Sequence, residues 1–518
     1  MSSDSNPAAT SAASSPDLRL HPLSWLFTLI GQLKQFALPL LILLFTGKGS
    51  NTDLWGLFGV GALMVWSVAQ YFTYRYRIES DGVVIRSGIF QRSARHIPFA
   101  RIQNVSLHQS LLHRLFNVAE VRLESAGAAK PEGQMRVLRL DAAHELEQQI
   151  RARGAATAAA SATASMPAGA HSELLLALPA SEVIRLGLIN NRGMLVVGGM
   201  FAVLAQSGDN LIGEIFKAVG QWFSGQASAM HLSLLAAVAA AIFLLLALLL
   251  LLRLLSVAIA LLQFHGFRLS ESEGRLSVER GLLTRLRSSV PRHRIQAYSL
   301  SEGLLHRFFH RQSLRVDTAV TEAANESRSM RDLAPIASPE TMDGLLDRLL
   351  PGHAWPISDW QPLHPRAWRR KFVPPVIIVL IATTALCYFR GLPALGLLAL
   401  LPLLYWRAVV WARHSAYSVS HGLVAFRGGW LSRHWRFAEI RKLQALEFMQ
   451  SPFDRRHGMA TLRFDTAGAG AMEPSLAIPY LPEAEARRLY ESLSQSLGAA
   501  RIAAPIQSRT VASAEPAP

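Results

Sequence analysis

The chain has 518 residues, of which 50% are apolar and 17% are charged, and its formal net charge is +16. This length allows several domains. The high apolar content together with the positive net charge predicts apolar membrane blocks that alternate with basic soluble segments. The lone Cys387 excludes a disulfide framework and a thiolate metal cluster. The basic residues are dispersed and lack interleaved aromatic residues, which argues against nucleic-acid binding and favours contact with anionic lipid.

Six apolar stretches occur in three pairs, and most are long enough to cross a hydrocarbon core of roughly 30 Å. The second pair is the least regular, because residues 211–223 have the amphipathic pattern of an interfacial helix. We expect transmembrane hairpins at residues 24–73, 181–264 and 369–413. The remaining segments are expected to be two disordered tails and two linkers, at residues 1–23, 499–518, 154–180 and 352–368.

The distribution of basic residues predicts the orientation of the hairpins. The loops inside the hairpins carry about one basic residue each, namely Lys48, Lys217 and Arg390, whereas the segments between hairpins carry many. By the positive-inside rule, both termini and all three soluble segments face the cytoplasm.

The segments that follow the three hairpins share one pattern. With Gly88, Gly281 and Gly429 in register, they read GIFQRSARHIPFARIQ, GLLTRLRSSVPRHRIQ and GWLSRHWRFAEIRKLQ. The match continues without a gap and predicts that one unit occurs three times. The coinciding polar residues include Arg92/Arg285/Arg433, Arg101/Arg294/Lys442, Gln103/Gln296/Gln444, Arg114/Arg307/Arg455 and Arg122/Arg315/Arg463.

Each copy has the pattern of a small antiparallel β domain. Residues 76–85 read as two strands joined by a turn at Asp81-Gly82. Every copy then ends in an amphipathic helix, and an antiparallel half-barrel closed by that helix suits this order. The three aligned glycines are expected to need positive φ in hairpins, and they lack the context of a phosphate-binding loop. The expected domains are residues 74–153, 265–351 and 414–498.

A helix pair followed by a strand, an X-Gly turn, a basic strand, an Arg-Ile-Gln element and a closing helix resembles the bacterial membrane-flanked pleckstrin-homology-like (PH-like) domain family. Three copies in one chain are similar to its long YdbT-like members. The resemblance implies an α+β membrane protein in which each transmembrane hairpin precedes a cytoplasmic PH-like β-barrel or sandwich with a C-terminal helix. It also implies the bacterial inner membrane, a shorter YdbS-like single-domain partner and no particular reaction. The third copy departs at Lys442-Leu443-Gln444 and at Pro452-Phe453.

The basic positions of the repeat are the candidate sites for lipid headgroups or a protein partner. Residues 74–127, 265–328 and 414–468 each carry a net charge of +4, which suits units held near an anionic leaflet. The alternative is that these side chains solvate outward strand faces or pair with neighbouring acids. The nine candidates are Arg92, Arg95, Arg101, Arg285, Arg287, Arg294, Arg433, Arg436 and Lys442.

No pattern predicts a catalytic site, a cofactor or a metal. His306 and His310 have a ligand spacing on a helix, but no third ligand is evident. Arg253 is interpreted as marking the point where its helix leaves the membrane core, with an ion path as the alternative.

The leading hypothesis is a non-enzymatic inner-membrane scaffold whose three PH-like domains bind anionic lipid or proteins multivalently. An exposed sheet edge on each unit can also pair units with each other or with a partner. The alternative is a transport or channel component whose domains regulate the membrane helices. A membrane enzyme acting on lipid is a weaker third hypothesis, because no carboxylate or histidine cluster stands out.

Overall fold

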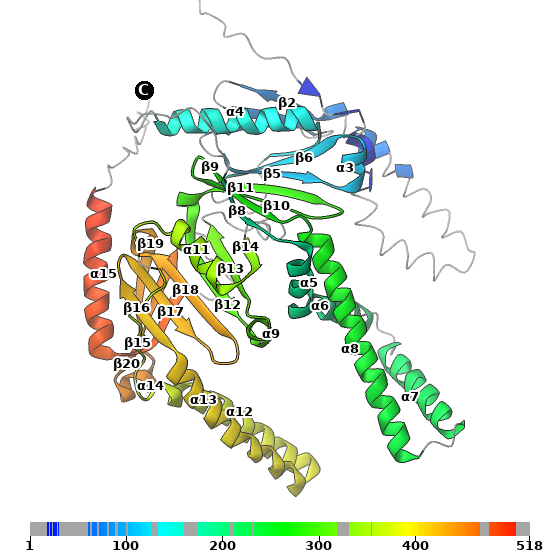
Figure 1. The fold of residues 1–518 in the computed structure, drawn as a ribbon, viewed down its shortest axis with the longest axis vertical. Helices are drawn as coiled ribbons and strands as arrows, with labels where there is room; N and C mark the ends of the chain where they lie inside the picture. The colour runs from blue at the N-terminus through cyan, green and yellow to red at the C-terminus, as the bar shows by residue number, and fades with distance from the viewer. Residues whose placement is uncertain are drawn as a thin grey trace, which may run out of the picture. The chain divides into compact units, whose positions relative to one another are not determined.

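The computed structural model of the chain (Figure 1) shows two compact units, Met1–Arg292 with Val320–Met330, and His293–Ala319 with Arg331–Pro518. It describes residues 18–19, 21–22, 24–27, 29–30, 61–62, 65–69, 72–79, 82–88, 92–99, 102–125, 133–159, 173–206, 211–229, 233–318, 331–353, 355–466 and 476–503. The first hairpin expected from the sequence, residues 24–73, lies mostly outside these residues, as does the tail after residue 503.

The first copy forms a four-stranded antiparallel sheet and three strands of a second sheet. The four-stranded sheet has the order β1-β2-β3-β4, with β1 at Leu18–Arg19, β2 at Arg75–Ile78, β3 at Gly82–Ser87 and β4 at Ser93–Pro98. The following elements are β5 (Ile102–Gln109), α3 (Leu111–Leu115), β6 (Val118–Ser125), β7 (Gly133–Arg139) and α4 (Leu140–Ala159).

The second sheet of the first unit crosses the boundary between copies. Its order is β7-β6-β5-β11-β10-β9-β8, so β5 of the first copy pairs with β11 of the second (Figure 1). The strands from the second copy are β8 (Glu173–Ala177), β9 (Arg268–Ser272), β10 (Arg275–Arg280) and β11 (Arg285–Pro291). The expected pairing of units through a sheet edge is therefore confirmed within the chain.

The second unit repeats this arrangement in a sheet of order β14-β13-β12-β18-β17-β16-β15. The second copy supplies η2 (Arg292–Arg294), β12 (Ile295–Glu302), α9 (Leu304–Phe308), β13 (Gln312–Thr318), β14 (Asp332–Ala337) and α11 (Pro339–Leu349). The third copy supplies β15 (Gln361–Pro362), β16 (Ala416–Ser420), β17 (Leu423–Gly428) and β18 (Arg433–Glu439).

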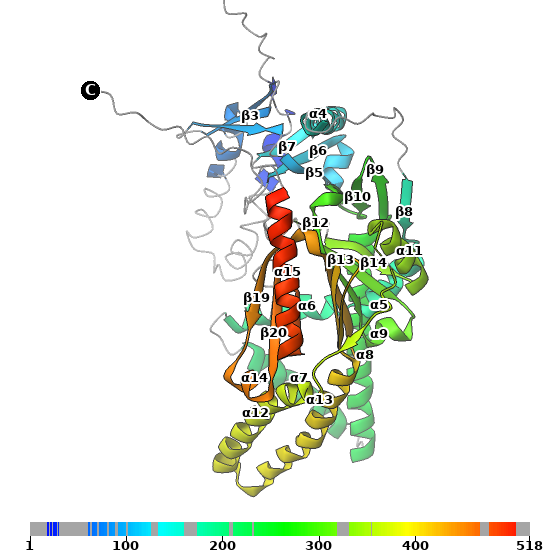
Figure 2. The same cartoon turned by 90° about the vertical axis from the view of Figure 1, so that its left-hand side faces the viewer.

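The third copy continues with η4 (Ile440–Lys442), β19 (Leu443–Met449), α14 (Pro452–His457), β20 (Met459–Thr466), β21 (Leu476–Pro482) and α15 (Glu483–Ala503). Strands β19, β20 and β21 form a three-stranded sheet, and α15 runs along β19 and β20 (Figure 2).

Two cores show how the halves of a copy combine. In the first copy, Val83 and Ile97 from the four-stranded sheet share a core with Val121, Met135 and Leu146, which come from the second sheet and α4. The third copy builds an equivalent core from β16–β18, β19–β21 and α15. Each of these copies is thus two facing sheets with a closing helix. The second copy has its two halves in different compact units.

A short strand precedes each hairpin and differs from the tail and linkers expected there. Leu18 pairs with Tyr76, Leu176 with Leu269 and Gln361 with Tyr417, so each short strand pairs with the first strand after its hairpin. Strands of two to five residues are too short to show the alternation that identifies a strand in a sequence.

Three described helices are long and apolar enough to cross a membrane, at Val238–Phe264, Ala367–Arg390 and Leu392–His414. The third expected hairpin has both of its spans among them, and the second has one. The helices of these two hairpins are α5 (Ala180–Ile189), α6 (Arg192–Gln206), α7 (Leu211–Ala229), α8 (Leu234–Phe264), α12 (Ala367–Arg390), η3 (Leu392–Ala399) and α13 (Leu400–His414).

Close packing and capping join α5 to α8. A Cβ on Gly187 would lie 2.5 Å from Val257 Cα, so only glycine allows this approach. At the end of α5, Arg253 Nη1 donates to the carbonyl of Leu188 at 3.0 Å and to Asn191 Oδ1 at 2.7 Å. The first bond satisfies a backbone carbonyl that the helix end leaves open, and the second holds the side chain of Asn191 just after the helix. Arg253 therefore has a structural role that the sequence alone did not indicate.

Replacing Arg253 with Met should loosen the end of α5, because it removes these hydrogen bonds and keeps most of the side-chain volume. We expect a local loss of about 1–3 kcal/mol. Hydrogen exchange of residues 180–191 in the full-length protein measures it. The matched control is Arg488→Met on α15, an exposed side chain that pairs with Glu485 at 3.0 Å. Unchanged exchange in Arg253→Met would contradict the capping role.

Candidate functional site: a basic rim at the ends of the membrane helices

The hairpin tip between the second and third long strands of each copy begins at one of the aligned glycines. The φ angles of Gly88, Gly281 and Gly429 are 121°, 110° and 93°. At Gly281 a Cβ would lie 2.0 Å from the Thr284 carbonyl oxygen, so a side chain is sterically excluded. The expectation of positive φ at the aligned glycines is confirmed.

Two of these tips contact candidate membrane spans. In the second copy, the backbone N–H groups of Gly281 and Leu282 donate to the carbonyls of His265 and Leu262 at the end of α8, at 2.9 and 3.0 Å. In the third copy, the Trp430 ring meets Trp406 in the middle of α13 edge-on, with centroids 4.7 Å apart. Both tips therefore lie against the span that leads into their own soluble domain.

The tips carry exposed apolar side chains next to arginines. Leu282, Leu283 and Leu431 are 39%, 42% and 45% exposed, and Arg285 and Arg433 begin the strands that follow. Apolar side chains beside basic ones suit the boundary between headgroups and acyl chains. This position against a span gives the tips the chemistry of an interfacial contact.

A short helix of the preceding copy holds each of these tips. Arg114 Nη1 of α3 donates to the Leu282 carbonyl at 3.0 Å, and Arg307 Nη1 of α9 donates to the Trp430 carbonyl at 3.1 Å. The sequence repeat showed the trio Arg114, Arg307 and Arg455 but gave no reason for it. The structure gives a reason for Arg114 and Arg307, because each side chain joins its copy to the next by a hydrogen bond.

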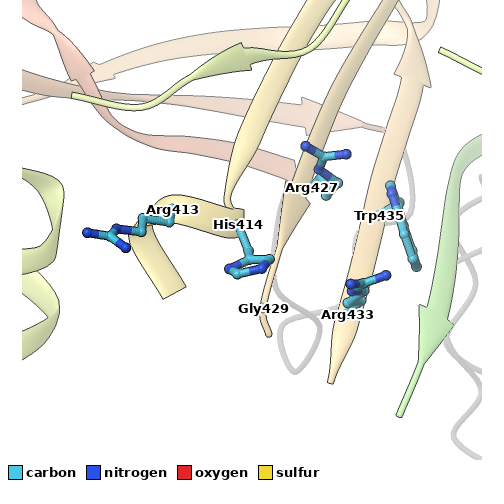
Figure 3. A pocket seen from close by; sticks show the side chains of 6 residues that line it. All are labelled: Arg413, His414, Arg427, Gly429, Arg433 and Trp435. Atoms are coloured by element: carbon cyan, nitrogen blue, oxygen red, sulfur yellow. The ribbon is translucent and has the colours of Figure 1, made fainter. Parts of the chain in front are cut away.

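A basic cavity of about 170 Å³ lies at the end of α13, beside the tip of the third copy. His414, Arg427 and Arg433 face it from α13, β17 and β18, whereas the Arg413 guanidinium points away from the strands (Figure 3). None of its six lining residues is acidic, and the full lining is Arg413, His414, Arg427, Gly429, Arg433 and Trp435.

The positive charges of the cavity are close together. Burial, and then the charge of Arg433, lower the pKa of Arg427. The carboxylate of Glu302 approaches Arg433 only to 4.0 Å, and the Arg427 guanidinium lies over the Trp360 ring. An anion such as a phosphate group would relieve this repulsion and accept charge-assisted hydrogen bonds.

The predicted basic candidates fall into different environments. Arg433 lines the cavity, and Arg285 begins the strand after the tip of the second copy. Arg287 pairs with Glu279 at 3.1 Å on the sheet face, and Arg294 lies in η2. Arg101 lies outside the described residues.

Of the remaining four candidates, two form ion pairs with acidic residues and two lie at the edge strand β4. Arg436 is 9% exposed and its Nη2 donates to Asp317 at 2.5 Å, while Lys442 Nζ donates to Glu439 at 2.6 Å. These two ion pairs favour a structural role. Arg92 and Arg95 lie at the start of β4, on the edge of the four-stranded sheet.

The sequence reasoning missed Arg413, His414 and Arg427 as site residues. Arg413 and His414 have no basic counterpart in register in all three copies, so the repeat contains no signal for them. For the His306 and His310 pair, the residues that the structure describes include no group of three side chains able to hold a metal ion. His310 follows α9 with a left-handed φ of 50°.

The first junction between copies contains a half-buried histidine. His108 in β5 lies opposite Leu286 in β11. Burial lowers its pKa to about 4, and the positive charge of Arg122 and His113 adds to the effect, whereas Glu120 opposes it. The imidazole is therefore neutral in the folded junction at neutral pH.

The family model of the bacterial PH domain matches residues 26–154, 227–342 and 376–497, which together exceed half of the chain. The chain belongs to the bacterial PH domain family. Each match begins within the region expected to hold a hairpin and ends in the closing helix of its copy. The second and third matches therefore include candidate membrane helix as well as sheet. The expected three-copy organisation is confirmed.

The chain is also 20% identical, over 472 residues, to the UPF0699 transmembrane protein YdbT of Bacillus subtilis (strain 168). The alignment covers 88% of this chain and 94% of that protein. No solved structure matches the chain at a significant level. The relative and the three candidate spans together support a membrane location.

Acidification should weaken the first junction through His108. Because its pKa is near 4 when folded and near 6.5 when unfolded, the unfolded state binds the proton more tightly between these values. Stability is greatest above pH 6.5 and falls by at most about 3 kcal/mol as the pH drops to 4. Hydrogen exchange of residues 102–109 and 285–291, corrected for intrinsic rates, measures the loss. The variant His108→Leu should remove this pH dependence; if it persists, another group is responsible.

Proposed function

We propose that this protein is a non-enzymatic, multi-pass protein of the bacterial inner membrane that presents three PH domains to the cytoplasmic leaflet as a multivalent scaffold. Its primary ligands are anionic phospholipid headgroups, and its protein ligand is a YdbS-like single-domain membrane protein, as the resemblance implies. The basic cavity at the end of α13 carries the proposal, because Arg427, Arg433 and His414 face it beside a candidate membrane span (Figure 3).

Electrostatics supports binding at the inner leaflet. A basic residue near an anionic surface contributes roughly 1 kcal/mol, so each site is modest by itself. The three domains are linked to one membrane-fixed chain, and their binding events reinforce each other through effective concentration. With both termini and all three domains on the cytoplasmic side, every domain meets the same leaflet.

The alternative, a transport or channel component, requires polar side chains that face one another between spans. Hydroxyl side chains in the described spans instead bind backbone: Thr383 donates to the Val379 carbonyl and Thr384 to the Leu380 carbonyl within α12. Ser256 of α8 donates to the Asn190 carbonyl at 2.6 Å. These bonds support the scaffold over a conduction path along these helices.

Replacing Arg427 and Arg433 together with Ala should weaken binding of phosphatidylglycerol to the full-length protein roughly ten- to thirtyfold, at about 1 kcal/mol per charge. Native mass spectrometry of the detergent-solubilised protein, titrated with phosphatidylglycerol or phosphatidylcholine in a salt series, measures it. The wild type should prefer phosphatidylglycerol, and salt should reduce that preference.

The matched control removes Arg487 and Arg488 of α15, two exposed arginines that pair with Glu483 and Glu485 on their own helix. Their loss changes the net charge by the same amount as the loss of Arg427 and Arg433, and it leaves the cavity intact. Equal binding of the two lipids by the wild type, or an equal loss in the control, would contradict headgroup recognition at the cavity.

A further inference from the structure

The two junctions between copies use one register. In the first, Arg285 of β11 lies opposite Gln109 of β5; in the second, Arg433 of β18 lies opposite Glu302 of β12. Arg285 and Arg433 are equivalent positions of the repeat, as are Gln109 and Glu302. Each copy therefore offers the last strand of its first sheet to the preceding copy and the first strand of its second sheet to the following one.

The first copy has no preceding copy and the third copy has no following one, so one strand of each of these two types lacks such a neighbour among the described residues. Strand β4 ends the four-stranded sheet and β19 ends the three-stranded sheet, and no strand lies beyond either within the described part of the chain. Residues 93–96 of β4 are exposed, whereas the equivalent residues Ser289 and Phe437 at the junctions are buried. Ala445 of β19 is exposed, whereas the equivalent Ala297 is fully buried.

The charged residues at β4 and beside β19 match those of the second junction. There, Arg436 donates to Asp317 at 2.5 Å, and both side chains are buried by the pairing of β18 with β12. The equivalent of Arg436 in the first copy is Arg95 on β4, and the equivalent of Asp317 in the third copy is Asp465 on β20. Asp465 is exposed.

We propose that β4 of one copy of the chain pairs antiparallel with β19 of a second copy and so repeats the internal junction between molecules. The shared register places Ser93 opposite Met449 and Arg95 opposite Glu447, with Asp465 on the neighbouring strand. The two surfaces differ, so the contact is head-to-tail and continues from molecule to molecule. A bare strand edge is a template for this kind of pairing.

A second copy of the chain can pair with these edges by repeating the register of the internal junctions, with no other geometry required. Pairing of β4 with β19 of the same chain would instead close the three copies into a ring, which requires three successive junctions to add up to a full turn. The inference does not depend on lipid binding, since neither edge contributes a residue to the basic cavity.

Disulfide trapping tests the register. Two chains, both carrying Cys387→Ser, carry Ser93→Cys and Met449→Cys respectively, with different affinity tags, and are co-expressed and oxidised in native membranes. Directly opposed residues bring Cβ atoms to about 5 Å, close enough for a disulfide after a small adjustment. We expect a mixed, reducible dimer that both tags recover.

Matched variants decide the outcome. Leu446→Cys in place of Met449→Cys moves the thiol by about 10 Å along the strand and should lower the mixed-dimer yield at least tenfold. The pair His108→Cys and Leu286→Cys in one chain, opposite each other in β5 and β11, should cross-link internally and show that the variants fold. Arg95→Glu should reduce the mixed dimer, and Glu447→Arg in the other chain should restore it.

Three results would overturn the proposal. A Ser93→Cys, Met449→Cys double variant that yields only an internally cross-linked monomer would assign the two edges to closure within one chain. Equal yields at positions 446 and 449 would show random collision. An internal cross-link between positions 108 and 286 without any mixed dimer would show folded chains whose ends do not pair.

Discussion

Backbone hydrogen bonding between successive copies is the constraint on which the rest of the structure depends. A sheet edge exposes unpaired N–H and C=O groups, and each copy has four edge strands because its strands are divided between two groups. Pairing β5 with β11 and β12 with β18 satisfies four of these edges at once. The cost is that the second copy has no sheet of its own, since both of its halves are completed by neighbours.

This division has consequences at the membrane. Because β11 and β18 are anchored in a neighbour's sheet, the tips that precede them are held by the neighbour's short helix, through Arg114 and Arg307. The same tips contact α8 and α13. Each of these two spans is thus connected to the adjoining copy through a strand pair and one hydrogen bond from an arginine.

The third copy is specialised in two ways. Its short helix α14 has a capping box in which Ser451 and Asp454 satisfy each other's backbone N–H groups. Arg370 at the start of α12 also pairs with Asp454 at 2.8 Å, so its hairpin and soluble domain are joined by an ion pair. These residues coincide with the Pro452-Phe453 departure from the repeat. The same copy contributes the basic cavity, which makes it the best candidate for direct headgroup contact.

The sequence by itself determined the elements that depend on local pattern: the three copies, the third hairpin, the long span α8 and the three glycines with positive φ. It also indicated that exposed sheet edges can pair units. Only the tertiary structure decided which edges meet. The Arg436–Asp317 pair joins residues 119 positions apart, and the cavity brings the end of α13 to β17 and β18. The ion pair follows from strand register across copies, which backbone hydrogen bonds set and which leaves no periodic signal within one copy. The cavity follows from the packing of α13 against β17 within the third copy, a tertiary contact that no local pattern encodes.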